Sequence, residues 1–273
     1  MKRLDLEVLL REGIIRELHY YDEAPSTNDL AKERARLFSV SESAVMDEKC
    51  YELFIADTQT AGRGRMGRIW KSPVSKNISM SLLSKTALPG ESIPGVTLLA
   101  ALAVTDAVTE LLLSEGHSDI AEGIKIKWPN DVVISGRKLS GILTELVFPY
   151  IICGIGINVN TPSFPEELSD KATSLLLETG AEKNRAELIN DITRRLVSYV
   201  NQYEHEQDLG FILEKYNKLL VSMDKEVILS GYPDTYIAKG INKTGALLVQ
   251  DSSGDVISVS SGEVSVRGLY GYT

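Results

Sequence analysis

The sequence has few cysteines and few histidines, and each scarcity argues against a class of site. Its 273 residues include only 2 cysteines, Cys50 and Cys153, far apart and in no C-x-x-C spacing. Neither a disulfide framework nor a thiolate metal site is therefore indicated. The 3 histidines, His19, His117 and His205, are scattered and form no metal-binding motif. We expect the two thiols to be reduced.

Export and membrane signals are also missing. The N-terminal sequence MKRLDLEVLLREG mixes charges into its apolar residues, unlike a signal peptide. The most apolar stretch, 96–113, contains Asp106 and Glu110, which predicts a buried or amphipathic helix. A formal net charge of -9 disfavours broad contact with nucleic acid or an anionic membrane, because both are negatively charged. We expect a cytoplasmic protein that binds neither.

Strand-like and helical patterns alternate through most of the chain and predict a mixed α/β core. Ser26 and Asp29 stand at the spacing of a capping box before a helix. A strand opening at Asn130 and Asp131 and turning at Ser135-Gly136 predicts a hairpin back through the next strand. The expected strands are 53–56, 78–83, 124–128, 138–147 and 151–159, and the expected helices are 27–38, 95–115 and 184–205.

The character of the sequence changes near residue 224. Short strands are expected at 226–229, 236–241, 246–250, 256–259 and 264–266, separated by turns of Gly, Pro, Asp and Ser. This density of strands predicts a small closed β domain. We therefore divide the chain into domains 1–223 and 224–273, with no long linker between them, and expect the two to pack together.

The segment 57–73, DTQTAGRGRMGRIWKSP, alternates glycine with arginine. Glycine lets a backbone approach a ligand closely, and guanidinium groups offer donor forks to carboxylate or phosphate. The segment therefore suits a loop that folds over an anion. A Gly-Arg segment for RNA binding and a mobile surface loop are the alternatives. The residues concerned are Gly62, Gly64, Gly67, Arg63, Arg65 and Arg68.

A second segment, KWPND at 127–131 followed by RKLSG at 137–141, places a lysine beside a turn fixed by proline. Such a lysine is a point charge aimed at one place, as adenylate-forming chemistry needs when negative charge moves toward pyrophosphate. A plain hairpin would explain the pattern as well. Core packing is the favoured role for Trp128, and Asn130 and Asp131 suit a turn as well as a ligand.

Two further segments suggest a ligand. Ser26, Thr27 and Asn28 offer hydroxyl and amide groups that either cap a helix, the locally favoured interpretation, or bind a polar head group such as a ureido ring. The run CGIGINVN at 153–160 is a strand whose two glycines permit close approach, but it lacks the dinucleotide fingerprint. No HExxH, G-x-S-x-G or Walker motif occurs, so ATP, if used, is held otherwise.

Taken together and in this order, these segments resemble the biotin protein ligases over nearly the whole chain, and the final GEVSVR at 262–267 resembles that family's C-terminal domain. The resemblance implies an α+β fold, with a mixed β-sheet flanked by helices as in class II aminoacyl-tRNA synthetases, and a C-terminal SH3-like barrel. It also implies that ATP activates biotin as biotinyl-5′-AMP, which a lysine of a biotin carboxyl carrier protein then receives. Mg²⁺ would be held mainly through the ATP phosphates.

The resemblance assigns residues to three overlapping roles. The implied biotin contacts are Ser26, Thr27, Asn28, Gln59, Arg63, Gly64, Arg65, Lys138, Gly141 and Gly156. The implied adenylate contacts are Arg65, Arg68, Trp70 as a platform for adenine, Lys127, Asn130 and Asp131. The implied catalytic residues are Lys138, Arg63, Arg65, Lys127 and Asp131.

The sequence differs from the family pattern in two places, and three other functions are alternatives to a biotin protein ligase. Only 25 residues precede Ser26, too few for the winged helix of members that act as repressors, so we expect no operator binding. Met66 stands where some relatives have arginine, which leaves adenylate retention open. The alternatives are a lipoate-type ligase, a non-catalytic biotin sensor and a Gly-Arg nucleic-acid binder. The sequence decides neither between a monomer and a homodimer, nor the carrier, nor the role of Arg267.

Overall fold

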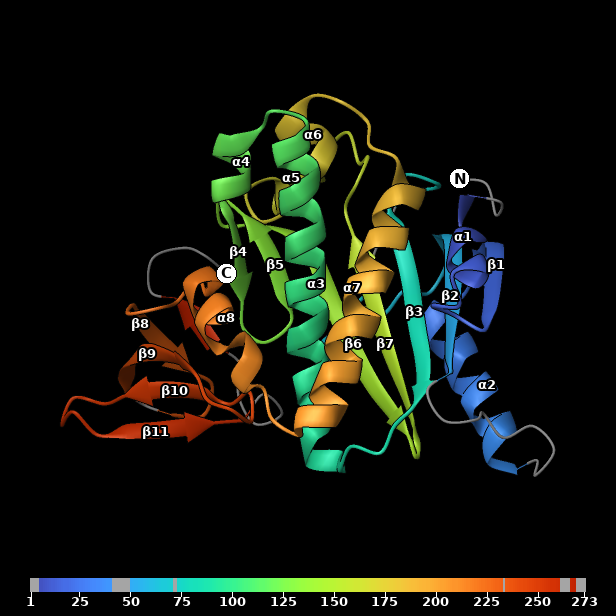
Figure 1. Cartoon of the computed structure of the whole chain (residues 1–273). Helices are drawn as coiled ribbons and strands as arrows, with labels where there is room; N and C mark the ends of the chain where they lie inside the picture. The colour runs from blue at the N-terminus through green and yellow to red at the C-terminus, as the bar shows by residue number, and fades with distance from the viewer. Residues whose placement is uncertain (1–4, 41–49, 71–72, 233, 261–265, 269–273) are drawn as a thin grey trace.

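The computed structural model describes residues 5–40, 50–70, 73–232, 234–260 and 266–268 (Figure 1). A seven-stranded mixed sheet has the order β1-β2-β3-β7-β6-β5-β4, and a five-stranded antiparallel sheet has the order β11-β10-β9-β8-β12. Within the larger sheet β1 runs parallel to β2, and the other neighbours are antiparallel. The strands of the larger sheet are β1 Glu17–Ala24, β2 Tyr51–Gln59, β3 Ile78–Lys85, β4 Ile124–Lys127, β5 Asp131–Ile134, β6 Arg137–Val147 and β7 Tyr150–Ile157.

Helices cover both faces of the larger sheet, and a smaller sheet follows at the C-terminal end. The helices are α1 Val8–Arg11, α2 Thr27–Val40, α3 Ile93–Ser114, α4 Ser118–Glu122, α5 Glu166–Ser169, α6 Leu175–Thr179, α7 Arg185–Glu206 and α8 Leu213–Leu219, with 3₁₀ turns η3 Arg65–Gly67, η4 Gly90–Ser92 and η5 Gly210–Ile212. The remaining strands are β8 Glu226–Leu229, β9 Thr235–Ile241, β10 Leu247–Gln250, β11 Val256–Val259 and β12 Val266–Gly268.

The long helices α3 and α7 lie side by side over one face of the larger sheet (Figure 1). By length and composition alone, the segment Gly90–Ser114 could cross a membrane, but most of it is buried inside the protein. A helix that is apolar nearly all round is what the centre of a core requires. The expectation of a buried helix at 96–113 is therefore confirmed, and α3 is the central helix of the main hydrophobic core.

Helix α2 covers the opposite face of the sheet. Ala31, Ala35 and Phe38 form a second apolar cluster with Phe54 and Leu83 and with residues of β7. Because side chains alternate along a strand, the sheet contributes one set of side chains to each core. Since α2 and the loop after β2 lie on this second face, they can enclose a cavity against the strands beneath them.

The hairpin predicted from Ser135-Gly136 is present between β5 and β6. Both central residues have positive φ, 49° for Ser135 and 81° for Gly136, as a two-residue hairpin turn requires. The other predicted strands and helices are also present, with ends shifted by a few residues. Of the last predicted strand, positions 264–265 lie outside the described residues, and β12 begins at Val266.

The smaller sheet packs against the larger part, as expected. Trp128 is 3% exposed, and its indole Nε1 donates to the carbonyl of Gly245, at 3.0 Å. Val227 and Leu229 of β8 belong to the same core cluster as Trp128. The core-packing role predicted for Trp128 is therefore confirmed, and it joins the hairpin segment to the C-terminal sheet.

Candidate functional site

One cavity of about 980 Å³ lies over the β6 and β7 strands on the α2 side of the sheet. Residues from several segments that are far apart in the chain meet around it. Every site residue proposed from the sequence lines it: Ser26, Thr27, Asn28, Gln59, Arg63, Gly64, Arg65, Arg68, Trp70, Lys127, Asn130, Asp131, Lys138, Gly141 and Gly156.

Glycines form the floor of this cavity. Gly141 of β6 and Gly156 of β7 are paired in register. A Cβ on Gly156 would lie 2.6 Å from Cε2 of Trp70, and one on Gly154 would lie 2.0 Å from Oδ1 of Asn28. Side chains at these two positions would therefore displace the indole and the amide that lie on them. Gly154 and Gly156 are two residues apart, about 7 Å along an extended strand, so Asn28 and Trp70 mark two ends of the site.

The end near Asn28 is neutral and polar. Ser26, Thr27 and Asn28 are all buried at the start of α2. The backbone N–H of Thr27 donates to Oε1 of Gln59, at 2.8 Å. Because a backbone N–H can only donate, this contact fixes the oxygen of the Gln59 amide and leaves its NH₂ group as a donor. This end can therefore match a ligand with both donors and acceptors.

The other end is cationic. Nζ of Lys138 lies 2.7 Å from Oδ1 of Asp131, and Nδ2 of Asn130 donates to the same oxygen at 2.9 Å. Arg65 donates through Nη1 to Oδ1 of Asn130, at 2.9 Å. Burial lowers the pKa of Arg65, and Asp131 opposes this, but guanidinium stays charged in proteins. Lys138 also lies 5.7 Å from the centre of the Trp70 ring.

The Gly-Arg segment folds back on itself beside the cavity. The N–H of Gly64 donates to the carbonyl of Arg68 at 2.8 Å, and that of Trp70 donates to the carbonyl of Gly62 at 2.9 Å. Met66, with φ 55°, lies at the tip and is 80% exposed. These backbone bonds place the indole of Trp70 over the glycine floor.

Two arginines of this segment, Arg63 and Arg65, lie at different ends of the cavity, and the sequence did not predict this difference. Arg65 joins the cationic end, whereas Arg63 forms ion pairs with Asp29 and Glu145. Glu145 in turn accepts a hydrogen bond from Asn28. The guanidinium of Arg63 thus lies at the neutral end and is balanced by two carboxylates. Arg63 lines the same cavity as Arg65 and Lys138, and its described ion pairs are those with Asp29 and Glu145.

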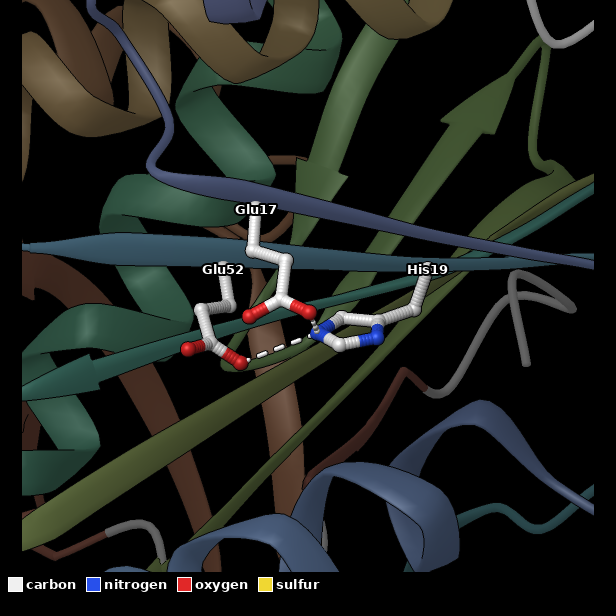
Figure 2. A group of neighbouring side chains, drawn as sticks. All are labelled: Glu17, His19 and Glu52. Atoms are coloured by element: carbon white, nitrogen blue, oxygen red, sulfur yellow. Dashed lines mark hydrogen bonds and ion pairs between the residues drawn. The ribbon is translucent and has the colours of Figure 1, made fainter. Parts of the chain in front are cut away.

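A separate group of ionisable side chains lies on β1 and β2, where Glu17, His19 and Glu52 point toward one another (Figure 2). The carboxylate of Glu52 is fully buried and accepts hydrogen bonds from Arg16, Arg34 and His19. Burial alone would raise the pKa of Glu52, but these hydrogen bonds outweigh it and lower the pKa to about 2. Cationic partners already occupy both oxygens, so this cluster is an ionic bridge between β1, β2 and α2.

Sequence reasoning missed two polar side chains behind the cavity wall, Ser81 and Glu145. Ser81 is fully buried on β3 and bonds to Thr27 and Asn28, and Glu145 on β6 bonds to Asn28 and Lys32. A signal was present for the first: the run ISMS at 78–81 alternates apolar with hydroxyl side chains on a strand. Glu145 sits in an ordinary polar position of an alternating strand and gives no comparable signal.

The fold and the site define a class: an α+β protein with a glycine-floored cavity that is polar at one end and cationic at the other. Two family models match the sequence. Residues 40–160 match the Biotin/lipoate A/B protein ligase family, and residues 225–267 match the Biotin protein ligase C terminal domain.

Individual relatives agree with these models. The bifunctional ligase/repressor BirA of Bacillus subtilis is 38% identical over 218 residues, which cover 74% of this chain and 62% of that protein. The biotin--[acetyl-CoA-carboxylase] ligase of Mycobacterium tuberculosis is 33% identical over 214 residues, covering 78% and 77%. The chain thus spans less than two thirds of the length of this BirA relative.

A solved structure extends the likeness to the fold. The biotin protein ligase from Aquifex aeolicus in complex with biotin and ATP superimposes with a TM-score of 0.75 at 28% identity, covering 93% of this chain and all of that one. The chain belongs to the biotin protein ligase family, and its C-terminal sheet is the SH3-like domain of that family.

Proposed function

We propose that this protein uses ATP to activate biotin as biotinyl-5′-AMP and transfers the biotinyl group to a lysine of a biotin carboxyl carrier protein. One observation carries the proposal: a single cavity joins a neutral polar end at Asn28 to a cationic end at Lys138 across a glycine floor. A ureido ring suits the first end, and a carboxylate meeting a phosphate suits the second. Relatives named as biotin ligases, and the Aquifex structure with biotin and ATP, support this assignment.

In the first half-reaction, an oxygen of the biotin carboxylate attacks the α-phosphorus of ATP, and pyrophosphate leaves. Two anions must approach each other, so the main task of the protein is to position them and to offset their charge. We assign this task to Lys138, Arg65 and Lys127, which line the cavity together. Arg63 would contact biotin from the neutral end of the cavity, where Asp29 and Glu145 hold its guanidinium group. Trp70 offers a flat surface for the adenine ring.

In the second half-reaction, the neutral amine of the carrier lysine attacks the acyl carbon of the mixed anhydride, and AMP leaves. The amine loses a proton, and Asp131 is our proposed helper for that step. The Gly-Arg segment beside the cavity would limit the access of water to the adenylate.

Magnesium fits the residues of the cationic end. Mg²⁺ prefers oxygen ligands and is commonly bound by one or two carboxylates together with substrate phosphates. Asp131, with Asn130 beside it, supplies a carboxylate of this kind next to Lys138. Bound there with the nucleotide, magnesium would offset phosphate charge. Binding and orienting biotin and ATP would still be the task of the cavity residues named above.

The setting of the reaction is also part of the proposal. We propose a reducing, cytoplasmic environment, which the free cysteines Cys50 and Cys153 suit. Broad contact with nucleic acid is disfavoured by the net charge of -9. We keep the division into domains 1–223 and 224–273, which the start of β8 at Glu226 suits.

The test is exchange of labelled pyrophosphate into ATP by the purified protein with magnesium, run in parallel with biotin and with lipoate. Exchange that depends on biotin supports the proposal, and transfer to a purified carrier domain completes it. Exchange with lipoate alone would assign the chain to the lipoate-type ligases instead. Biotin binding without exchange would assign it as a sensor, and salt-sensitive RNA binding without exchange would favour a nucleic-acid binder.

A further inference from the structure

Ser81 lies behind the neutral end of the cavity and touches two of its residues. It is 0% exposed, and its Oγ is 2.7 Å from Oγ1 of Thr27 and 2.6 Å from Oδ1 of Asn28. A hydroxyl has one hydrogen to donate, so it cannot donate to both. Which of them receives that hydrogen decides what Thr27 offers to a ligand.

The contacts of Asn28 settle the direction. Its Nδ2 donates to the carbonyl of Leu143 at 3.1 Å and to Oε2 of Glu145 at 2.8 Å, so both amide hydrogens have acceptors. Oδ1 therefore faces Ser81, and because a carbonyl oxygen only accepts, Ser81 must donate its hydrogen there.

The consequence passes to Thr27. With its hydrogen committed to Asn28, Ser81 can only accept from Thr27, and the other neighbour of the Thr27 hydroxyl, Oε1 of Gln59 at 3.2 Å, is also an acceptor. The Thr27 hydrogen therefore goes to the protein in either arrangement. What Oγ1 of Thr27 can offer to a ligand is a lone pair, which accepts an N–H.

Glu145 is itself held in place. Its Oε1 lies 2.6 Å from Nζ of Lys32, and Arg63 lies 3.4 Å from its Oε2. Its side chain is 23% exposed, whereas Asn28 is buried. The carboxylate thus fixes the Asn28 amide from the outer side of the cavity wall, while Ser81 fixes it from within the sheet.

We propose that Ser81 and Glu145 are positioning residues that make Thr27 a hydrogen-bond acceptor, so that the cavity selects acyl substrates whose ring carries N–H donors. This inference rests on the proposed function and adds the residues that set its specificity. A ureido ring has such donors and the dithiolane ring of lipoate has none. A site with committed polar groups strongly rejects an analogue that cannot pair with them.

Four variants test the network in biotin-dependent pyrophosphate exchange. Ser81→Ala and Glu145→Leu should each raise the KM for biotin about tenfold, the effect of one unsatisfied buried group, with a smaller change in kcat. Glu145→Gln keeps an oxygen that can accept from Asn28, so it should restore a KM near the wild-type value. Lys32→Met removes the ion pairs of Lys32 with Glu145 and Asp29 but keeps the Glu145 oxygen that accepts from Asn28, so it should raise the KM less than Glu145→Leu does.

Ser84→Ala is the matched control, because Ser84 is buried on the same strand but faces the opposite side of the sheet. Melting temperatures of all variants separate binding from folding. The inference is overturned if the wild type is active and neither Ser81→Ala nor Glu145→Leu raises the KM. Equal losses in Glu145→Leu and Glu145→Gln would overturn it as well.

The wild-type protein separates the two proposals. If it shows no biotin-dependent exchange, the proposed function fails, and calorimetric titration of biotin into the wild type and the same variants then tests the positioning role. Unchanged affinity in Ser81→Ala and Glu145→Leu, or no biotin binding by the wild type, would overturn the inference.

Discussion

Lys138 and Asp131 form an ion pair, with Nζ 2.7 Å from Oδ1, across a β-bulge in their hairpin. Asp131 is paired with Gly141, but beyond Val132 the register shifts, so that Val133 faces Lys138. A bulge redirects side chains and is common next to functional sites. Here it brings a lysine and an aspartate of one hairpin together beside the indole of Trp70.

The first prediction concerns Lys138→Ala. The variant should lower the rate of biotin-dependent pyrophosphate exchange about a hundredfold, because one preorganised charge is lost where phosphate charge develops. The melting temperature should change little, since the side chain is one third exposed. Lys218→Ala, which removes an exposed lysine, is the control. Equal losses of stability and activity would show that Lys138 supports the fold instead.

The second prediction concerns Arg65→Ala. Arg65 anchors the Gly-Arg segment to Asn130 and reaches the cationic end of the cavity. Without it, biotinyl-5′-AMP should leave faster, and activated biotin should modify lysines of an unrelated protein added to the reaction. Mass spectrometry of that protein measures the leak, with Arg194→Ala, at an exposed ion pair, as the control. If the variant releases biotinyl-5′-AMP at the wild-type rate, Arg65 does not help to retain the adenylate.

The third prediction concerns the glycine floor. In Gly156→Ala the new Cβ would lie 2.6 Å from the Trp70 ring, so the indole must shift. We expect the KM values for ATP and biotin to rise about tenfold or more, measured by initial rates of exchange. Gly90→Ala is the matched control, because a Cβ there meets no atom within 4 Å. Wild-type KM values in Gly156→Ala would mean that the position of Trp70 is unimportant.

The sequence predicted the elements that carry regular patterns, and the resemblance to the family implied part of the residues that line the cavity. The hairpin turn was readable because Ser135-Gly136 has the composition of a two-residue turn, and the glycine floor was readable as two glycines within a strand. Both signals are local. The family resemblance then indicated which of these segments meet.

What was not predicted depends on contacts between distant segments. Strand β1 was missed because ELHYYDEA alternates poorly, and its Glu17 and His19 belong to the ionic cluster that includes Glu52, 33 residues after His19. The partners of Arg63 were missed for the same reason, since Glu145 lies 82 residues further along the chain. Charge pairing at such separations has no sequence periodicity.

The ionic cluster around Glu52 gives the stability of the fold a pH dependence. The pKa of Glu52 falls from an ordinary value of 4.5 to about 2 on folding, because Arg16, Arg34 and His19 stabilise the carboxylate against the effect of burial. The folded protein therefore binds a proton at Glu52 less readily than the unfolded chain. Its contribution is present above pH 4.5 and is lost as the pH falls toward 2.

The fourth prediction follows from that direction. Urea unfolding at several pH values between 7 and 3 should show the free energy of unfolding falling at the acid end, with a share from Glu52 on the order of 2 kcal/mol by pH 3. Glu52→Gln cannot titrate, so its difference from wild type should be largest at pH 7 and shrink below pH 4.5. Exposed Glu91→Gln should keep the wild-type curve. A difference in the free energy of unfolding between Glu52→Gln and wild type that stays constant down to pH 3 would contradict this prediction. The Glu52 carboxylate would then make no acid-sensitive contribution to stability.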